Sequence, residues 1–274
     1  MDLKRSAGCL VFAGLLLTAC STVPMTGRKQ LALVPQSEMI AQADKSYRKV
    51  VEQGPLSSDR DATKQIRRVG KRISTAVDDY LRTHGQKDLA GQMHWEFNLI
   101  EKDEPNAWCM PGGKVVFYTG ILPYTKDDAG VASVMGHEIA HAIAGHSAER
   151  VSQQLLLQGG ALAVAGLTKD SKYRNAYVMA YGLGGNLGAI LPYSRLHESE
   201  ADRIGLILMA MAGYDPHAAV AFWERMAADK KGAPPEFLST HPSDAKRIRR
   251  LREELPEALK YYHPAGSDSL RADR

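Results

Sequence analysis

The chain has 274 residues, of which 44% are hydrophobic and 24% charged, and its formal net charge at pH 7 is +4. This length is enough for one substantial core, and the nearly balanced charge argues against a nucleic-acid-binding protein. Four basic residues gather at Lys246, Arg247, Arg249 and Arg250, and we interpret them as the solvated face of a helix.

The first twenty residues have the pattern of a bacterial lipoprotein signal. Two basic residues precede an apolar run over 10–17, and residues 17–20 read Leu-Thr-Ala-Cys. We predict a signal peptide over 1–19 and acylation of Cys20 as the mature N-terminus. A transmembrane anchor, the competing interpretation, needs roughly 20 apolar residues. Because Ser21 replaces the Asp that commonly retains such proteins at the inner membrane, we expect a lipid anchor at the periplasmic face of the outer membrane.

Cysteine usage agrees with this interpretation. Once residues 1–19 are removed, only Cys20 and Cys109 remain, so a lipidated Cys20 leaves no internal disulfide. We interpret Cys109 as a buried small hydrophobic residue in preference to a redox sensor.

The next hundred residues predict helices followed by a small sheet. Residues 20–36 are interpreted as a lipidated tether, followed by helices over 37–53 and from Ser58 to about residue 83, with Asp61 completing a capping box. Residues 94–101 alternate apolar and polar side chains, which predicts a half-buried strand. A turn over 110–113 leads to a second strand over 114–119. That strand is well placed to pair with an extended peptide as well as to serve as an ordinary sheet strand.

Residues 137–141 read His-Glu-Ile-Ala-His, the HExxH pattern of zinc peptidases. Helix positions four apart differ by about 40° in direction and about 6 Å along the axis, so both imidazoles can reach one metal ion. Glu138 points about 100° away from His137, where its carboxylate can hold a water molecule. Apolar residues recur at helical spacing over 131–143 after a potential cap at Thr125, which places the motif on a long buried helix.

The segment after the motif leaves several interpretations open. His146 lies nine residues after His137, half a revolution away on a continuous helix, so we interpret it as a packing or hydrogen-bonding residue. Residues 155–193 are rich in Gly and Ala, but three charged residues between 169 and 172 prevent a single membrane span. A mobile helical lid and a buried hairpin remain open, and membrane-surface contact lacks a basic amphipathic face.

A second acidic motif supplies the third ligand that a catalytic zinc requires. Residues 197–202 read His-Glu-Ser-Glu-Ala-Asp at the predicted start of a helix that runs to Gly213. Glu198 and Asp202 share a helix face, whereas Glu200 points about 200° away from Glu198. We therefore expect Glu198 to bind the metal and Asp202 to hydrogen-bond a ligand histidine. An acidic helix N-terminus stabilised by the macrodipole is the alternative interpretation.

The two motifs together resemble the HtpX/CAAX-protease-like family of gluzincin metallopeptidases, in which the leading Glu of an ExxxD motif is a ligand. Three further stretches resemble the bacterial lipoprotein branch related to LoiP and to the mitochondrial inner-membrane overlapping-activity protease. They are Asn-Ala-Trp-Cys-Met-Pro-Gly-Gly over 106–113, Leu-Pro-Tyr-Ser-Arg over 191–195 and Ser-Thr-His-Pro-Ser over 239–243. The similarity covers roughly residues 23–261. We expect neither the transmembrane helices nor the helical-repeat domain of other members in this chain, so we do not carry over their substrates.

The resemblance implies a mainly helical α+β, zincin-like peptidase domain over 37–263, with a small sheet packed on the HExxH helix and a flexible tail over 264–274. One Zn²⁺ per chain would be held by His137, His141 and Glu198, with Glu138 as the general base. The resemblance also places His241 near the site, as an oxyanion donor or as a latch on the open metal position. A turn before a helix begun by Ser243 is the alternative role for that segment.

We therefore expect a membrane-anchored zinc endopeptidase of the bacterial periplasm. Its substrates would be unfolded or misassembled envelope proteins, in quality control of the cell envelope. One alternative is a chaperone-like lipoprotein that holds outer-membrane polypeptides without cleaving them, and another is a zinc-stabilised scaffold. Glu138 argues against both alternatives, because a structural zinc site does not need this carboxylate and is completed by a fourth protein ligand.

Overall fold

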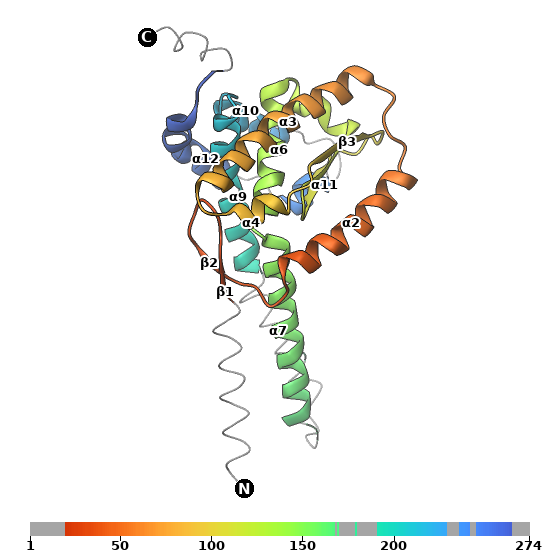
Figure 1. The fold of residues 1–274 in the computed structure, drawn as a ribbon, viewed down its shortest axis with the longest axis vertical. Helices are drawn as coiled ribbons and strands as arrows, with labels where there is room; N and C mark the ends of the chain where they lie inside the picture. The colour runs from red at the N-terminus through yellow and green to blue at the C-terminus, as the bar shows by residue number, and fades with distance from the viewer. Residues whose placement is uncertain are drawn as a thin grey trace.

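The computed structural model describes residues 20–167, 169, 179, 191–228, 236–241 and 245–264 (Figure 1). The predicted signal peptide, the Ser243 turn, all but residue 264 of the predicted tail, and all but two residues of 168–190 lie outside these ranges. The elements are β1 (Cys20–Thr22), β2 (Lys29–Leu31), α2 (Gln36–Gln53), α3 (Arg60–Thr83), α4 (Lys87–Gly91), β3 (Glu96–Ile100), β4 (Ala107–Met110), β5 (Lys114–Tyr118), η1 (Thr119–Ile121), α5 (Leu122–Thr125), α6 (Asp128–Ile143), α7 (His146–Leu167), α9 (Leu191–Met211), α10 (His217–Ala228), α11 (Glu236–Thr240), α12 (Ala245–Ala258) and η3 (Leu259–Tyr261). The mainly helical α+β prediction is confirmed.

Helix α6 carries the HExxH motif through the centre of the fold. Every residue from Gly130 to Ile143 is buried, and α3, α9 and α10 pack around the helix. The predicted cap was wrong by two residues. The Asp127 side chain accepts the Gly130 N–H at 2.8 Å, whereas the Thr125 hydroxyl donates to the Leu122 carbonyl within α5. A helix that is buried on all sides holds its polar side chains in a low-dielectric interior, where their partners determine their charge.

Helices α6 and α9 approach each other closely through two glycines. A Cβ on Gly136 would lie 2.8 Å from the Gly205 carbonyl oxygen, and a Cβ on Gly205 would lie 2.9 Å from the His137 backbone nitrogen. No larger residue fits at either position without moving a backbone. Asp202 is three residues before Gly205 on the same face, so this contact brings the acidic side chains of α9 against the HExxH face of α6.

The three-stranded sheet has the order β3-β5-β4, with β3 parallel and β4 antiparallel to β5. Alternate side chains face opposite layers: Leu99, Val115 and Phe117 join the main core, whereas Ile100 and Val116 pack against α2. The two predicted strands are confirmed as β3 and β5. The expectation that the second would pair with a peptide was wrong, because β5 has a partner on each side and β4 is the edge strand that packs on α6.

Helix α9 begins at Leu191, well before the acidic motif that was predicted to open it. Glu198, Glu200 and Asp202 therefore lie within the helix and are all buried. An acidic helix N-terminus does not explain them, because the favourable dipole effect is confined to the first turn.

The N-terminal residues differ from the tether predicted over 20–36. Strands β1 and β2 form an antiparallel hairpin in which Cys20 pairs with Leu31, and Val23 is buried in the main core. The hairpin is fixed by long-range contacts with α6, α7 and α9, for which the local sequence carried no periodic signal.

Helix α7 extends away from the body of the protein (Figure 1). Its outer half exposes Leu155, Leu156, Leu162 and Leu167. In the described part of the chain, no helix combines the length and apolar character that a membrane crossing needs. The choice between a lid and a hairpin over 155–193 depends mainly on residues outside the described ranges.

Candidate metal centre

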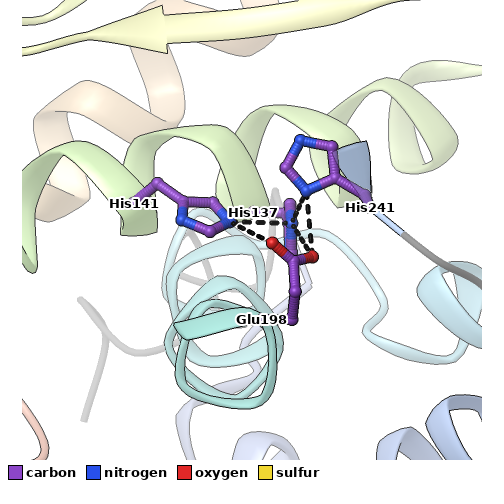
Figure 2. Close-up of side chains that lie close together, drawn as sticks. All are labelled: His137, His141, Glu198 and His241. Atoms are coloured by element: carbon purple, nitrogen blue, oxygen red, sulfur yellow. Dashed lines mark hydrogen bonds and ion pairs between the residues drawn. The ribbon is translucent and has the colours of Figure 1, made fainter. Parts of the chain in front are cut away.

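Four side chains from three separate parts of the chain meet at one point (Figure 2). His137 and His141 project from α6, Glu198 from α9, and His241 follows the end of α11; one potential ligand atom from each lies within 4.8 Å of the others. His141 Nε2 is 3.2 Å from His137 Nε2 and 3.3 Å from Glu198 Oε1. His241 Nδ1 is 2.9 Å from Glu198 Oε2 and 3.1 Å from His137 Nε2. All three predicted ligands and His241 therefore face one small volume.

Glu138, the residue after the first histidine, lies beside this group and is 4% exposed. Its Oε1 atom is buried, has no hydrogen-bond partner among the described residues, and lies 3.5 Å from His241 Nε2. Burial raises the pKa of this carboxyl above its ordinary value, partly offset by the nearby histidines. An unbonded buried carboxylate oxygen is costly, so its retention beside the donor group indicates a chemical role.

His137 is held from behind by an acidic residue, as the helix-face argument predicted. Asp202 Oδ1 lies 3.0 Å from His137 Nδ1, which leaves Nε2 for the donor group. Burial alone would lower the pKa of His137, but hydrogen bonds to Asp202 and Glu198 raise it to about 9. Burial would raise the pKa of Glu198, but its hydrogen bonds with His137, His141 and His241 hold that pKa far below its ordinary range.

Arg247 completes this support, and our interpretation of it as a solvated residue was wrong. It is 1% exposed and makes two hydrogen bonds to Asp202, at 2.6 and 2.9 Å. Its guanidinium stacks 3.4 Å over the Trp223 ring, and Nη1 lies 3.3 Å from Glu198. The signal was available in the sequence: Arg247 shares the apolar face of α12 with Leu251 and Leu255, four and eight residues later.

Replacing Arg247 by Met is expected to destabilise the fold by about 3–5 kcal/mol, because it leaves the Asp202 carboxylate buried without its cation. Urea unfolding of the full chain measures this change. Arg249→Met is the control, because Arg249 lies exposed on the same helix and its loss should stay within about 0.5 kcal/mol. Equal stability of the two variants would contradict the structural role of Arg247.

Behind His141 lies a second polar network that the sequence did not predict as a group. His146 Nδ1 is 2.8 Å from His141 Nδ1, and His146 Nε2 is 3.1 Å from Glu200. The hydrogen-bonding role predicted for His146 is confirmed. Burial lowers its pKa to about 4, whereas burial of Glu200 is outweighed by hydrogen bonds that lower the pKa of that carboxyl to about 2. Glu200 is thus excluded from the donor group and serves a different cluster.

Two further predicted residues lie apart from the donor group. Cys20 is exposed at the start of the hairpin and is a free thiol. Cys109 on β4 is also free and packs against the main core, and burial together with the nearby Glu138 raises its pKa well above the ordinary value. A thiol in such surroundings stays protonated and unreactive, in keeping with a packing role.

The donor set fits zinc. Two imidazoles and one carboxylate are the ligands of one well-known class of catalytic zinc sites, and carboxylate support of a ligand histidine is the usual second layer. The Oε1 atom of Glu138 is buried with no hydrogen-bond partner among the described residues, so it can accept a hydrogen bond from a water molecule bound to the metal. A cation bound here would offset the negative charge of the buried carboxylates.

Comparison with known proteins gives an independent result. Residues 64–255 match the model of peptidase family M48. The chain is 38% identical over 241 residues to the mitochondrial metalloendopeptidase OMA1 of Schizosaccharomyces pombe. The aligned residues cover 86% of this chain and 66% of that protein. Identity to the human mitochondrial metalloendopeptidase OMA1 is 30% over 263 residues, which cover 92% of this chain and 49% of the relative.

A bacterial relative is more distant: the beta-barrel assembly-enhancing protease of Escherichia coli is 28% identical over 240 residues, or 85% of this chain and 47% of that protein. The chain thus spans between about half and two thirds of the length of these relatives. The family match covers both motifs of the donor group, which lie on α6 and α9. On this evidence the chain belongs to peptidase family M48.

Proposed function

We propose that this protein is a zinc-dependent endopeptidase in which His137, His141 and Glu198 hold the metal. The observation that carries the proposal is a buried carboxylate oxygen of Glu138 that has no hydrogen-bond partner in the described part of the chain and lies beside a compact group of imidazole and carboxylate donors. When bound, zinc would polarise the scissile carbonyl and make a water molecule more acidic.

Three residues of this chain have further roles in the proposed reaction: Glu138, Asp202 and Arg247. Glu138 takes a proton from the attacking water and returns it to the leaving nitrogen, and burial brings its pKa closer to that of an effective base. Asp202 fixes the His137 tautomer so that Nε2 faces the metal position, and Arg247 holds Asp202 in place.

The edge strand β4 is the natural partner for an extended peptide. It pairs only with β5 in the described part of the chain and packs on α6, and its Cys109 lies near enough to Glu138 for that carboxyl to raise the pKa of the thiol. Main-chain pairing at such an edge gives affinity with little demand on sequence, which suits unfolded polypeptides as substrates. This proposal replaces the expectation that the strand over 114–119 pairs with the peptide.

His241 has two candidate roles that predict opposite effects of His241→Ala on casein cleavage. As a latch on the open metal position it would inhibit, so its removal would raise cleavage. As an oxyanion donor it would contribute to rate, so its removal would lower cleavage by about 10²–10³-fold. We favour the latch, because Nδ1 lies among the three predicted ligands. Unchanged cleavage would reject both roles.

The same position of His241 gives the zinc-stabilised scaffold its one supporting observation, because four protein donors are typical of a structural site. Casein digestion by the chain with and without added zinc separates the two functions. Zinc-dependent cleavage supports the peptidase. Zinc-dependent stability without cleavage, in both the wild type and His241→Ala, supports the scaffold. Casein that is bound but not cut would support the chaperone-like alternative.

We further propose that acylation of Cys20 anchors the protein to the periplasmic face of the bacterial outer membrane. There it would act on unfolded or misassembled envelope proteins. The name of the Escherichia coli relative supports a role near envelope assembly. Exposure of Cys20 at the start of the hairpin leaves its thiol accessible for modification.

Cys20→Ser is expected to abolish incorporation of labelled palmitate and to leave either a soluble protein or one that retains its signal segment, because the substitution removes the acylated thiol. Metabolic labelling followed by fractionation measures both effects, and Cys109→Ser is the matched control. Equal labelling of the wild type and Cys20→Ser would contradict the anchor.

A further inference from the structure

We propose that the N-terminal β1–β2 hairpin is a positioning element of the metal centre: Arg28 and Thr26 hold Glu200, which orients His146, which in turn fixes the proposed zinc ligand His141. This inference rests on the zinc-binding role given to His141 above. It assigns the hairpin a function in metal binding that a membrane tether would not have.

The first step follows from the tautomer of His141. Its Nε2 faces the donor group, 3.3 Å from Glu198 Oε1, and a nitrogen that binds a metal carries no proton. The proton of the neutral ring is therefore on Nδ1, which lies 2.8 Å from His146 Nδ1. His141 must donate in this bond and His146 must accept.

The second step assigns the His146 tautomer by the same logic. If Nδ1 accepts from His141, the proton of the neutral His146 ring is on Nε2. That atom lies 3.1 Å from Glu200 Oε2, which can only accept when ionised. A carboxylate at this position thus favours the one His146 tautomer that leaves His141 ready to bind metal.

The hairpin determines where that carboxylate lies. Arg28 Nε donates to Glu200 Oε2 at 2.8 Å, and the Thr26 hydroxyl donates to Glu200 Oε1 at 2.5 Å. The Arg28 Nη atoms form a bidentate pair with Glu149 at 3.0 and 2.7 Å. One guanidinium therefore bridges carboxylates on α7 and α9, in the geometry that makes such contacts directional.

A stacked ring prevents His146 from tilting. Its ring lies parallel to that of His197 with centroids 4.2 Å apart, and His197 Nε2 is 2.8 Å from Glu149 Oε2. His146 and His197 are both almost completely buried. The Glu149 carboxylate that Arg28 holds therefore also holds the ring against which His146 packs.

The turn after α6 brings His146 to this position. Gly145 has φ +71°, which ends α6 just before α7 begins at His146, and Gln30 Nε2 of the hairpin donates to the Ala144 carbonyl at 2.8 Å. On one continuous helix His146 would lie half a revolution from His137, but Gly145 interrupts the helix.

The two proposed histidine ligands thus have comparable supports. His137 is backed by Asp202 and Arg247, and His141 is backed through His146 by Glu200 and Arg28. Both supports end in an arginine, one from α12 and one from the hairpin. Loss of the hairpin contacts should therefore weaken zinc binding.

Zinc affinity of the full chain, measured by competition with a fluorescent chelator, tests the proposal. Arg28→Met and His146→Phe are each expected to weaken zinc binding by about 10–100-fold, the range for outer partners of metal ligands. Lys29→Met is the matched control, because Lys29 is an exposed cation on the same hairpin that contacts only Thr22 among the described hydrogen bonds. It should bind zinc as the wild type does.

A second measurement separates positioning from general stability. The visible spectrum of the cobalt-substituted protein reports ligand geometry, and it should change in Arg28→Met and His146→Phe but not in Lys29→Met. If either variant fails to fold, Thr26→Val removes one hydrogen bond to Glu200 and should still change the spectrum. Lower melting temperatures with zinc affinity within threefold of the wild type and an unchanged spectrum would overturn the proposal. A wild type that binds no zinc would instead refute the proposed function.

Discussion

Glu138→Gln is expected to lower casein cleavage by at least about a hundredfold, while zinc content stays at the wild-type level. The amide has nearly the shape of the carboxylate but cannot take a proton from water, so a general-base contribution of this size is lost. The buried Oε1 atom of Glu138 has no hydrogen-bond partner in the described structure, so the substitution breaks no existing hydrogen bond at that atom.

The substitution should be made in the wild type and in His241→Ala. If His241 inhibits the wild type, the loss of cleavage can be measured only in the His241→Ala background. Metal analysis and circular dichroism of each variant show whether zinc and fold are retained. Casein cleavage by Glu138→Gln within tenfold of its parent would exclude Glu138 as the base.

Glu198→Ala is expected to produce a protein that loses zinc on gel filtration, whereas Glu200→Ala retains one equivalent with weakened affinity. Glu198 offers both oxygens to the donor group, within 3.3 Å of His141 and 3.4 Å of His137. Glu200 faces the opposite direction along α9, toward Arg28 and His146. The two variants are matched in helix, residue type and burial.

Metal content after gel filtration, followed by chelator competition on whatever zinc remains, ranks the two variants. Zinc lost from Glu200→Ala and retained by Glu198→Ala would exchange the roles assigned to the two glutamates.

The parts of the site that could be predicted are those in which spacing within one helix determines geometry. His137 and His141 face the same way because they are four residues apart on α6, and Glu198 was preferred to Glu200 because it shares a face with Asp202. Both arguments need only helical periodicity, which the apolar pattern of α6 supplied.

Arg247 was misassigned because its charge and its basic neighbours were given more weight than its position on the helix. Arginine is rarely buried without a partner, and its partner, Asp202, lies 45 residues earlier in the chain. The apolar residues Leu251 and Leu255 on the same face of α12 indicated burial. A buried basic residue on an apolar helix face is therefore a useful signal for an acidic residue in an active site.

The hairpin and the sheet order could not be predicted for a different reason. Arg28 contacts residues 121 and 172 positions away, and no local pattern encodes such contacts. Strand β4 has four residues, and its place at the edge is decided by pairing with β5 across the Gly112–Gly113 turn. Pairing of this kind depends on the folded arrangement, so only the presence of a small sheet followed from the sequence.

The most direct test of the account is a zinc titration of the metal-free chain, with casein cleavage measured for the wild type and His241→Ala at each step. The account predicts that cleavage in at least one of the two proteins rises with added zinc and reaches a plateau at one equivalent per chain. Cleavage that is unaffected by zinc and by chelator, or the absence of cleavage from both zinc-loaded proteins, would contradict it.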